Sequence, residues 1–129
     1  MPNSKKVILD TNFLLIPGQF GVDIFTEIDR ICQFPYTLYI VDKTLQELES
    51  ILQNQRGKAK EAVKLALGII KAKNINTLPS ANKSVDDAIV DAATEDMIVA
   101  TQDAALKQRL KDKAGGIITL RQKKYLILT

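Results

Sequence analysis

The chain lacks histidine altogether and has a single cysteine among its 129 residues. Hydrolysis by a Ser-His-Asp triad and histidine-based RNA transphosphorylation both need an imidazole, and ordinary zinc sites need imidazoles or several thiolates. A disulfide within the chain is also impossible, which fits a reducing compartment. Catalysis near neutral pH must therefore come from carboxylates, lysine, tyrosine or a metal-bound water.

Aromatic residues and long apolar runs are scarce as well. Aromatic residues make up 5% of the sequence and tryptophan is absent, so stacking is not expected to dominate contacts with single strands. The run Val7-Ile8-Leu9 is too short for a signal peptide or a membrane span, and we predict a cytoplasmic protein. No Gly-x-x-x-x-Gly-Lys-Ser/Thr sequence occurs, which excludes nucleotide hydrolysis of the P-loop type.

The sequence does contain a regular alternation of β-prone runs and helical patterns. Strands are predicted at 5–11, 36–41, 75–78, 97–100 and 117–120, with a further edge strand at 125–128. Helices are predicted at 22–32, 44–52, 58–72, 84–95 and from Asp103 to Lys111, with a loop at 17–21. This order predicts an α/β fold, a three-layer α/β/α sandwich with a central, mainly parallel sheet of four to six strands. We expect one domain over residues 1–129. Cys32 falls on the apolar face of its helix and is predicted to be a small buried side chain.

Four acidic residues stand where an apolar run gives way to a helical pattern: Asp10, Glu47, Asp87 and Asp103. In an open parallel sheet the carboxyl ends of the strands share one edge, where ligands bind. Two like charges about 4 Å apart repel by roughly 4 kcal/mol at an effective dielectric near 20, so a shared cation or proton is expected between such carboxylates. Without histidine, that cation is a hard one, and we predict one or two Mg²⁺ or Mn²⁺ ions.

Each acid also has a purely structural interpretation. Thr44-x-x-Glu47 fits a helix-capping box, and Ser84-x-x-Asp87 resembles one. Asp103 can cap its helix, and Asp10 can end its strand in an Asx-turn. Capping does not account for four acids at one edge, and it is compatible with metal binding because helix N-termini favour ionised carboxylates. Asp86 is ambiguous between a residue that supports the site and a solvated residue of the first helical turn, and the second is slightly favoured.

The charge distribution favours an anionic ligand, although only weakly. The net charge is +3, from 18 basic and 15 acidic residues. An acidic pocket in a basic surround suits a polyanion. Any single basic side chain is more often simply solvated, but three groups are candidates for phosphate contacts. They are Arg56, Lys60, Lys64 and Lys71; Lys107, Arg109 and Lys111; and Arg121, Lys123 and Lys124.

Four segments, in order along the chain, resemble the successive signatures of PIN-domain nucleases. They are Val7-Ile-Leu-Asp-Thr-Asn-Phe-Leu-Leu15, Glu47, Asp87-Ala-Ile-Val-Asp-Ala-Ala93 and Val99-Ala-Thr-Gln-Asp-Ala-Ala-Leu-Lys107. Within the family, the Ser-Val-Asp-Asp segment and the C-terminal Gly-Gly-Ile-Ile-Thr-Leu-Arg segment look closest to the ribosomal-RNA-processing subgroup. The VapC-type toxins are the other similar group.

The resemblance implies a metal-dependent endoribonuclease whose products carry a 5′-phosphate and a 3′-hydroxyl. The implied metal ligands and catalytic residues are Asp10, Glu47, Asp87 and Asp103. Asn12, Thr101 and Asp86 are the candidates for hydrogen-bonding to these ligands and orienting them. Separately, the charge distribution makes Arg56, Lys60, Lys64, Lys107 and Arg109 the candidates for RNA contacts. One departure from the family pattern is Ala105, which stands where many members have another acid. A second metal is therefore expected to bind weakly, or only with substrate phosphate.

Two other functions remain open at this point. Phosphatases of the haloacid dehalogenase type also begin with a strand and Asp-x-Asp, but Asn12 puts an amide where that chemistry needs its second carboxylate. A catalytically weak PIN-like module for RNA binding or ribosome assembly is the stronger alternative, although all four main acids are retained. The expected partners are RNA, an antitoxin or ribosome-assembly protein, and a second copy of the chain, with no membrane.

Overall fold

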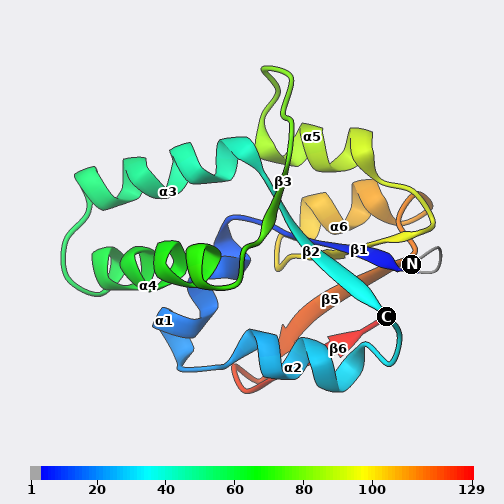
Figure 1. Ribbon diagram of the computed structural model, residues 1–129, viewed down its shortest axis with the longest axis horizontal. Coiled ribbons are helices and arrows are strands. Elements are labelled where there is room, and N and C mark those ends of the chain that lie inside the picture. The colour runs from blue at the N-terminus through cyan, green and yellow to red at the C-terminus, as the bar shows by residue number, and fades with distance from the viewer. Residues whose placement is uncertain (1–3) are drawn as a thin grey trace.

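The computed structural model describes residues 4–129, in which six strands form a single sheet (Figure 1). The strands are β1 Lys5–Leu9, β2 Tyr36–Val41, β3 Asn76–Leu78, β4 Met97–Ala100, β5 Gly116–Arg121 and β6 Tyr125–Leu128. Their spatial order is β3-β2-β1-β4-β5-β6. Every neighbouring pair is parallel except β5 and β6, which are antiparallel. The predicted mainly parallel sheet is confirmed. The predicted domain includes residues 1–3, which lie outside the described part of the chain.

Helices cover both faces of this sheet. They are a short 3₁₀ helix η1 Asn12–Leu15, followed by α1 Ile16–Phe20, α2 Ile24–Ile31, α3 Asp42–Asn54, α4 Lys58–Ala72, α5 Val85–Ala92 and α6 Ala104–Leu110. Figure 1 shows α5 and α6 together on one side of the strands. Two separate hydrophobic cores result, one on each face, which confirms the three-layer α/β/α architecture.

The side chains of β1 alternate between these cores, as expected for a strand buried on both faces. Val7 and Leu9 pack with residues of α1, α2 and α4, whereas Ile8 packs with residues of α5 and α6. Cys32 belongs to the first core and is 5% exposed, and its burial raises the pKa of the thiol. The prediction of a small buried side chain at Cys32 is confirmed.

The segment predicted as a loop at 17–21 is mostly helical, and this prediction was wrong. Pro17 lies in the first turn of α1, where its missing N–H has no intrahelical partner to lose. Gly21 ends the helix in the left-handed conformation with a φ of 67°. The proline and glycine therefore mark the two ends of a short helix. The preceding strand ends at Leu9, two residues before the predicted end at 11.

The helix starts around the predicted acids differ from one another. α3 begins at Asp42 after Val41, and no side chain caps it, so the capping-box interpretation of Thr44 and Glu47 does not hold. Ser84 does cap α5, by accepting a hydrogen bond from the Asp87 backbone N–H at 3.1 Å. That helix ends at Ala92, earlier than the predicted 95.

The strand order changes direction at β1. From β1 the chain passes to β2 and β3 on one side, then returns to β4 and β5 on the other. Leu9 of β1 is in register with Ala100 of β4, so the carboxyl ends of these two strands lie side by side. This is the topological switch point where ligands bind in open α/β sheets. None of the described helices is long and apolar enough to cross a membrane.

Candidate functional site

A pocket of about 420 Å³ lies at the carboxyl ends of β1 and β4. Four carboxylates from four different places in the chain line it. Asp10 follows β1, Glu47 comes from α3, Asp86 from the first turn of α5, and Asp103 precedes α6. The remaining lining residues are Thr11, Asn12, Ser50 and Ile51, so no cationic side chain lines the pocket among the described residues.

Asp10 is the most buried of these acids, at 5% exposed. One carboxylate oxygen accepts from the Thr11 N–H at 2.8 Å, and the other accepts from the Thr101 hydroxyl at 2.8 Å. Burial raises the pKa of Asp10, the two hydrogen bonds oppose that rise, and the charges of Asp86 and Asp103 add to it. The backbone around Asp10 is tied to β4, since its N–H donates to the Ala100 carbonyl at 3.0 Å.

Thr101 connects two of the carboxylates. Its hydroxyl donates to Asp10 and accepts from the Asp103 backbone N–H at 3.1 Å. The Asp103 carboxylate in turn caps α6 by accepting from the Leu106 N–H at 3.0 Å, as the sequence predicted. A single buried hydroxyl therefore sets the position of both acids at the switch point.

Glu47 is held by a chain of hydroxyl groups. The Thr11 hydroxyl donates to Glu47 Oε1 at 2.6 Å and lies 2.9 Å from the Thr44 hydroxyl. Because Thr11 has one hydroxyl proton and gives it to Glu47, the Thr44 hydroxyl donates to Thr11. Thr44 and Glu47 therefore interact with the segment after β1 and leave their own helix end uncapped, which explains why the capping interpretation fails.

Asp86 and Asp87 stand in the reverse of the predicted arrangement. Asp86 is half-buried and lines the pocket, and burial followed by the nearby Asp103 charge raises its pKa. Asp87 is exposed, and its carboxylate accepts from Arg109 of α6 at 2.8 Å. This hydrogen bond holds the pKa of Asp87 below its usual value. Neighbouring residues of a helix point in different directions, so only one of the two faces the pocket.

The other predicted site residues occupy different places. Asn12 lines the pocket with an exposed side chain. Ala105, at the position of the missing acid, is exposed on α6. The predicted basic residues all lie outside the pocket lining: Arg56, Lys60, Lys64 and Lys71 on or before α4; Lys107, Arg109 and Lys111 on or after α6; and Arg121, Lys123 and Lys124 at the β5–β6 turn.

The donor chemistry of the pocket fits a hard divalent cation. Carboxylate oxygens are ligands that Mg²⁺ and Mn²⁺ prefer, and burial next to other carboxylates raises the pKa of both Asp10 and Asp86. Within residues 4–129, no group of three or more His, Cys, Asp or Glu side chains is close enough together to hold one ion directly. Mg²⁺ usually keeps several water ligands and is bound through one or two carboxylates, so it does not require three direct ligands from the chain.

The family model described as a PIN-like domain matches residues 7–123, which includes all four carboxylates. The chain belongs to the PIN-like domain family. The alternative of a phosphatase of the haloacid dehalogenase type is therefore set aside. Ribonuclease VapC4 of Methanocaldococcus jannaschii is 32% identical to this PIN-like chain over 122 residues, covering 93% of each protein.

Solved structures agree with this assignment. The PIN domain endonuclease Utp24 superposes with a TM-score of 0.74 at 25% identity, covering 95% of this chain and 90% of that one. A domain of a functionally unknown protein from Methanocaldococcus jannaschii superposes with a TM-score of 0.57 at 19% identity, covering 92% of each chain. The second similarity concerns the fold alone.

Proposed function

We propose that this PIN-like chain is a metal-dependent endoribonuclease, with one or two Mg²⁺ or Mn²⁺ ions held by Asp10, Glu47, Asp86 and Asp103. The observation that carries the proposal is the gathering of these four carboxylates in one pocket without a cationic side chain in its lining. The similarity to a ribonuclease and to a PIN domain endonuclease supports it. PIN nucleases generally use divalent metal ions, which agrees with the donor set.

A divalent ion bound there would supply an activated water for in-line attack on a phosphodiester and would stabilise charge on the leaving oxygen. The chain's own residues hold the ligands ready for that ion. Thr101 orients Asp10, and Thr11 orients Glu47, through hydrogen bonds of 2.8 and 2.6 Å. Cation binding favours the ionised forms of Asp10 and Asp86, whose pKa values burial has raised.

RNA outside the pocket would be held by basic side chains, for which Arg56, Lys60, Lys64, Lys107 and Arg109 remain the candidates. They lie on α4, on α6 and in the α3–α4 connection, outside the pocket lining. Arg109 also has a positioning role, because it anchors Asp87, and its charge opposes part of the rise in the pKa of the neighbouring Asp86. We propose products with a 5′-phosphate and a 3′-hydroxyl, and a role as a toxin-type ribonuclease or in ribosomal-RNA processing. The corresponding partner is an antitoxin or a ribosome-assembly protein.

The proposal is tested by incubating the protein with structured RNA in Mg²⁺, in Mn²⁺ and in EDTA, and by identifying the ends of the products. We expect cleavage in either metal and none in EDTA. Asp10→Asn and Asp103→Asn should each reduce the cleavage rate by at least about 100-fold. Even residues that only hydrogen-bond to a metal ligand change metal affinity or activity by about 10- to 100-fold when they are mutated.

Glu49→Gln is the matched control, since Glu49 is exposed on α3 two residues from Glu47 and does not line the pocket. Its rate should stay within about twofold of wild type. Equal activity of wild type and Asp10→Asn would point to a contaminating nuclease and would favour the RNA-binding module instead.

A further inference from the structure

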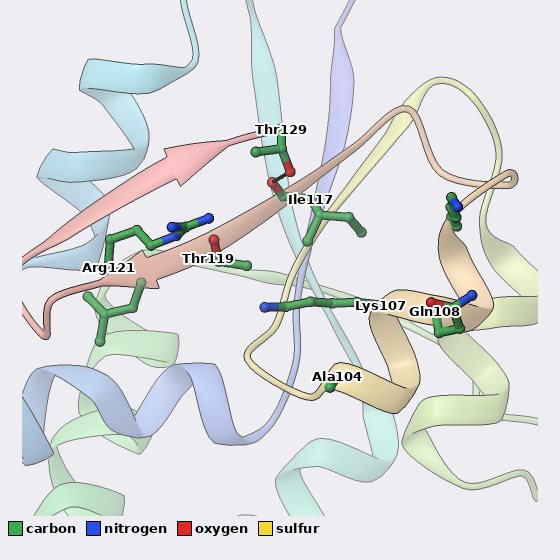
Figure 2. A pocket seen from close by; sticks show the side chains of 9 residues that line it. Ala104, Lys107, Gln108, Ile117, Thr119, Arg121 and Thr129 are labelled. Atoms are coloured by element: carbon green, nitrogen blue, oxygen red, sulfur yellow. Dashed lines mark hydrogen bonds between the residues drawn. The ribbon is translucent and has the colours of Figure 1, made fainter.

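A second cavity begins at Ala104, one residue beyond Asp103, and lies between α6 and β5. Its volume is about 600 Å³. Figure 2 shows Lys107 extending from α6 toward the strand that carries Thr119 and Arg121. This size falls in the range of small-molecule sites, about 300–1,000 Å³, and is large enough for a nucleotide.

The lining of this cavity is cationic. Lys107 and Lys111 come from α6, Arg121 comes from β5, and none of the lining residues is Asp or Glu. The ion pairs found within residues 4–129 do not include any of these three cations. Three positive side chains around one concave surface attract an anion, and arginine and lysine are the usual phosphate contacts.

The rest of the lining suits the other parts of a nucleotide. Ile117 and Leu120 supply apolar surface on which a ribose or base can rest. Thr119 and Gln108 add a hydroxyl and an amide for hydrogen bonds to a base or sugar. A phosphate alone would make no contact with the apolar side chains, whereas a nucleotide can contact both the apolar and the uncharged polar groups.

The cavity is tied to the carboxylate pocket through the start of α6. Asp103 lines the pocket, and the next residue, Ala104, lines the cavity. Gln102 fixes the connecting loop to β5, because its side chain accepts from the Leu120 N–H at 2.6 Å and donates to the Leu120 carbonyl at 3.3 Å. At 1.5 Å per residue along a helix, Lys107 is displaced from Asp103 by about 6 Å and Lys111 by about 12 Å.

We propose that this cavity binds a nucleotide of the RNA strand next to the phosphodiester that is cleaved. The inference rests on the proposed nuclease function and specifies where its substrate continues. Lys107, Lys111 and Arg121 contact the phosphates of the strand, and Ile117 and Leu120 support the ribose or base. Consecutive residues, Asp103 and Ala104, line the two cavities, so a strand that crosses the carboxylate pocket can reach these cations. This favours RNA over an acidic protein segment, which the pocket carboxylates would repel.

The test measures binding of a six-nucleotide single-stranded RNA by fluorescence anisotropy in Mg²⁺, with Asp10→Asn as the background that does not cleave it. Adding Lys107→Gln and Arg121→Gln together should raise the Kd by about tenfold, because two phosphate contacts are lost. Lys113→Gln is the matched control. Lys113 is exposed just beyond α6 and outside the cavity lining, so its Kd should stay within about twofold. Addition of RNA should also shift the backbone amide resonances of Thr119 and Arg121.

A Kd of the double variant within about twofold of its background would overturn the inference, even if the wild type cleaves RNA. So would a double variant that keeps its RNA affinity but loses affinity for a polyglutamate peptide, because the cavity would then belong to an acidic protein partner. Thermal unfolding of each variant checks that it is folded, and Lys111→Gln gives a second, independent removal of a lining cation. Failure of the nuclease proposal has a separate readout, namely no cleavage of RNA by the wild type in either metal.

Discussion

Asp86 and Asp87 are adjacent in the chain, yet their carboxylates have opposite surroundings. Asp86 lines a pocket with three other acids, where burial and the charge of Asp103 disfavour its ionised form. Asp87 faces Arg109 at the surface, where the guanidinium favours the ionised form. A divalent ion in the pocket would relieve the repulsion on Asp86 and would do little for Asp87. The two residues should therefore respond differently to the same substitution.

We expect Asp86→Asn to lower kcat/KM for RNA cleavage by about 100-fold, as for loss of a metal ligand. Asp87→Asn should lower it by about tenfold or less, because it removes only the partner that anchors Arg109 beside the site. Steady-state kinetics in Mn²⁺ would measure both values. A larger loss for Asp87→Asn than for Asp86→Asn would show that the predicted ligand was right and that the pocket geometry misleads.

The sequence contains a signal for the inward position of Asp86, in the residues that follow each acid. Three and four residues after Asp86 come Ile89 and Val90, both buried, whereas the same spacings from Asp87 lead to the buried Val90 and the exposed Asp91. Residues at these spacings share a helix face, so Asp86 lies on the inward face of α5. The family-like segment begins at Asp87, and that resemblance drew the assignment away from the helical pattern.

At the scale of elements, the short helices η1 and α1 were the part of the fold that the sequence did not predict. A helix of five residues leaves too short a pattern for periodicity to detect, and Pro17 and Gly18 suggested a loop. What stabilises α1 is its packing on α4, which no local pattern reveals. Gly18 lies so close to that helix that an added Cβ would sit 2.5 Å from the Ala62 Cα. The long α4 itself, with fifteen residues of clear helical spacing, was predicted with its observed limits.

This close approach gives a prediction with an internal control. Gly18→Ala should destabilise the protein by about 1–3 kcal/mol, because neither backbone can move aside without disturbing the packed core. Gly68→Ala, in the same α4, should stabilise it by about 0.5–1 kcal/mol, since an added Cβ there meets nothing within 4 Å. Urea unfolding of the two variants measures both changes. Destabilisation of similar size in both would mean that α1 does not pack on α4 as described.

The start of α2 gives a prediction about pH. The Asp23 carboxylate accepts from the backbone N–H groups of Phe25 and Thr26 at 3.1 Å each, and the bonds to Thr26 contribute most to holding the pKa of Asp23 below its usual value. Because the folded-state pKa is lowered, this stabilisation is complete above about pH 3.9 and is lost as pH falls through the folded value.

Asp23→Ala should therefore cost about 1 kcal/mol of unfolding free energy at pH 7. The difference between wild type and variant should shrink as the pH is lowered below about 3.9, where the wild-type cap becomes protonated. Denaturant unfolding across that pH range measures the difference directly. A difference that stays constant down to the acid limit would assign the cost to helix propensity and not to the charged cap.

For the molecule as a whole, the strand order is what assembles the site, and the sequence predicted the sheet without predicting that order. Which strands become neighbours depends on how the helices pack across both faces, and this is a property of the complete core. The order β2-β1-β4 places Asp10 and Asp103 at the carboxyl ends of adjacent strands. Glu47 lies on α3, whose Leu48 belongs to one hydrophobic core, and Asp86 lies on α5, which packs in the other core. The pocket thus depends on both helical layers being in place.

This assembly also separates charge across the molecule. Outside the four pocket acids, the chain has 18 basic residues and eleven acidic ones, which gives an excess of seven positive charges elsewhere. Under the proposed function, a metal ion would allow the acidic pocket to accept a phosphate, while the excess positive charge elsewhere would attract the RNA strand without one. Binding of RNA should accordingly depend steeply on salt, whereas the rate of cleavage from the bound state should not.

Three phosphate contacts, one each from Lys107, Lys111 and Arg121, correspond to a slope of about −2 in a plot of log affinity against log salt concentration for a single strand. Raising NaCl from about 50 to about 200 mM should then weaken binding of the six-nucleotide RNA to Asp10→Asn by roughly 20-fold. The wild-type kcat at saturating RNA should change far less over the same range. Of the pocket residues proposed to act on the phosphodiester, Asp10 is buried and Glu47 and Asp86 are partly buried, so salt screens them little. Salt-independent binding would contradict phosphate recognition by these side chains and would assign the affinity to contacts with the bases.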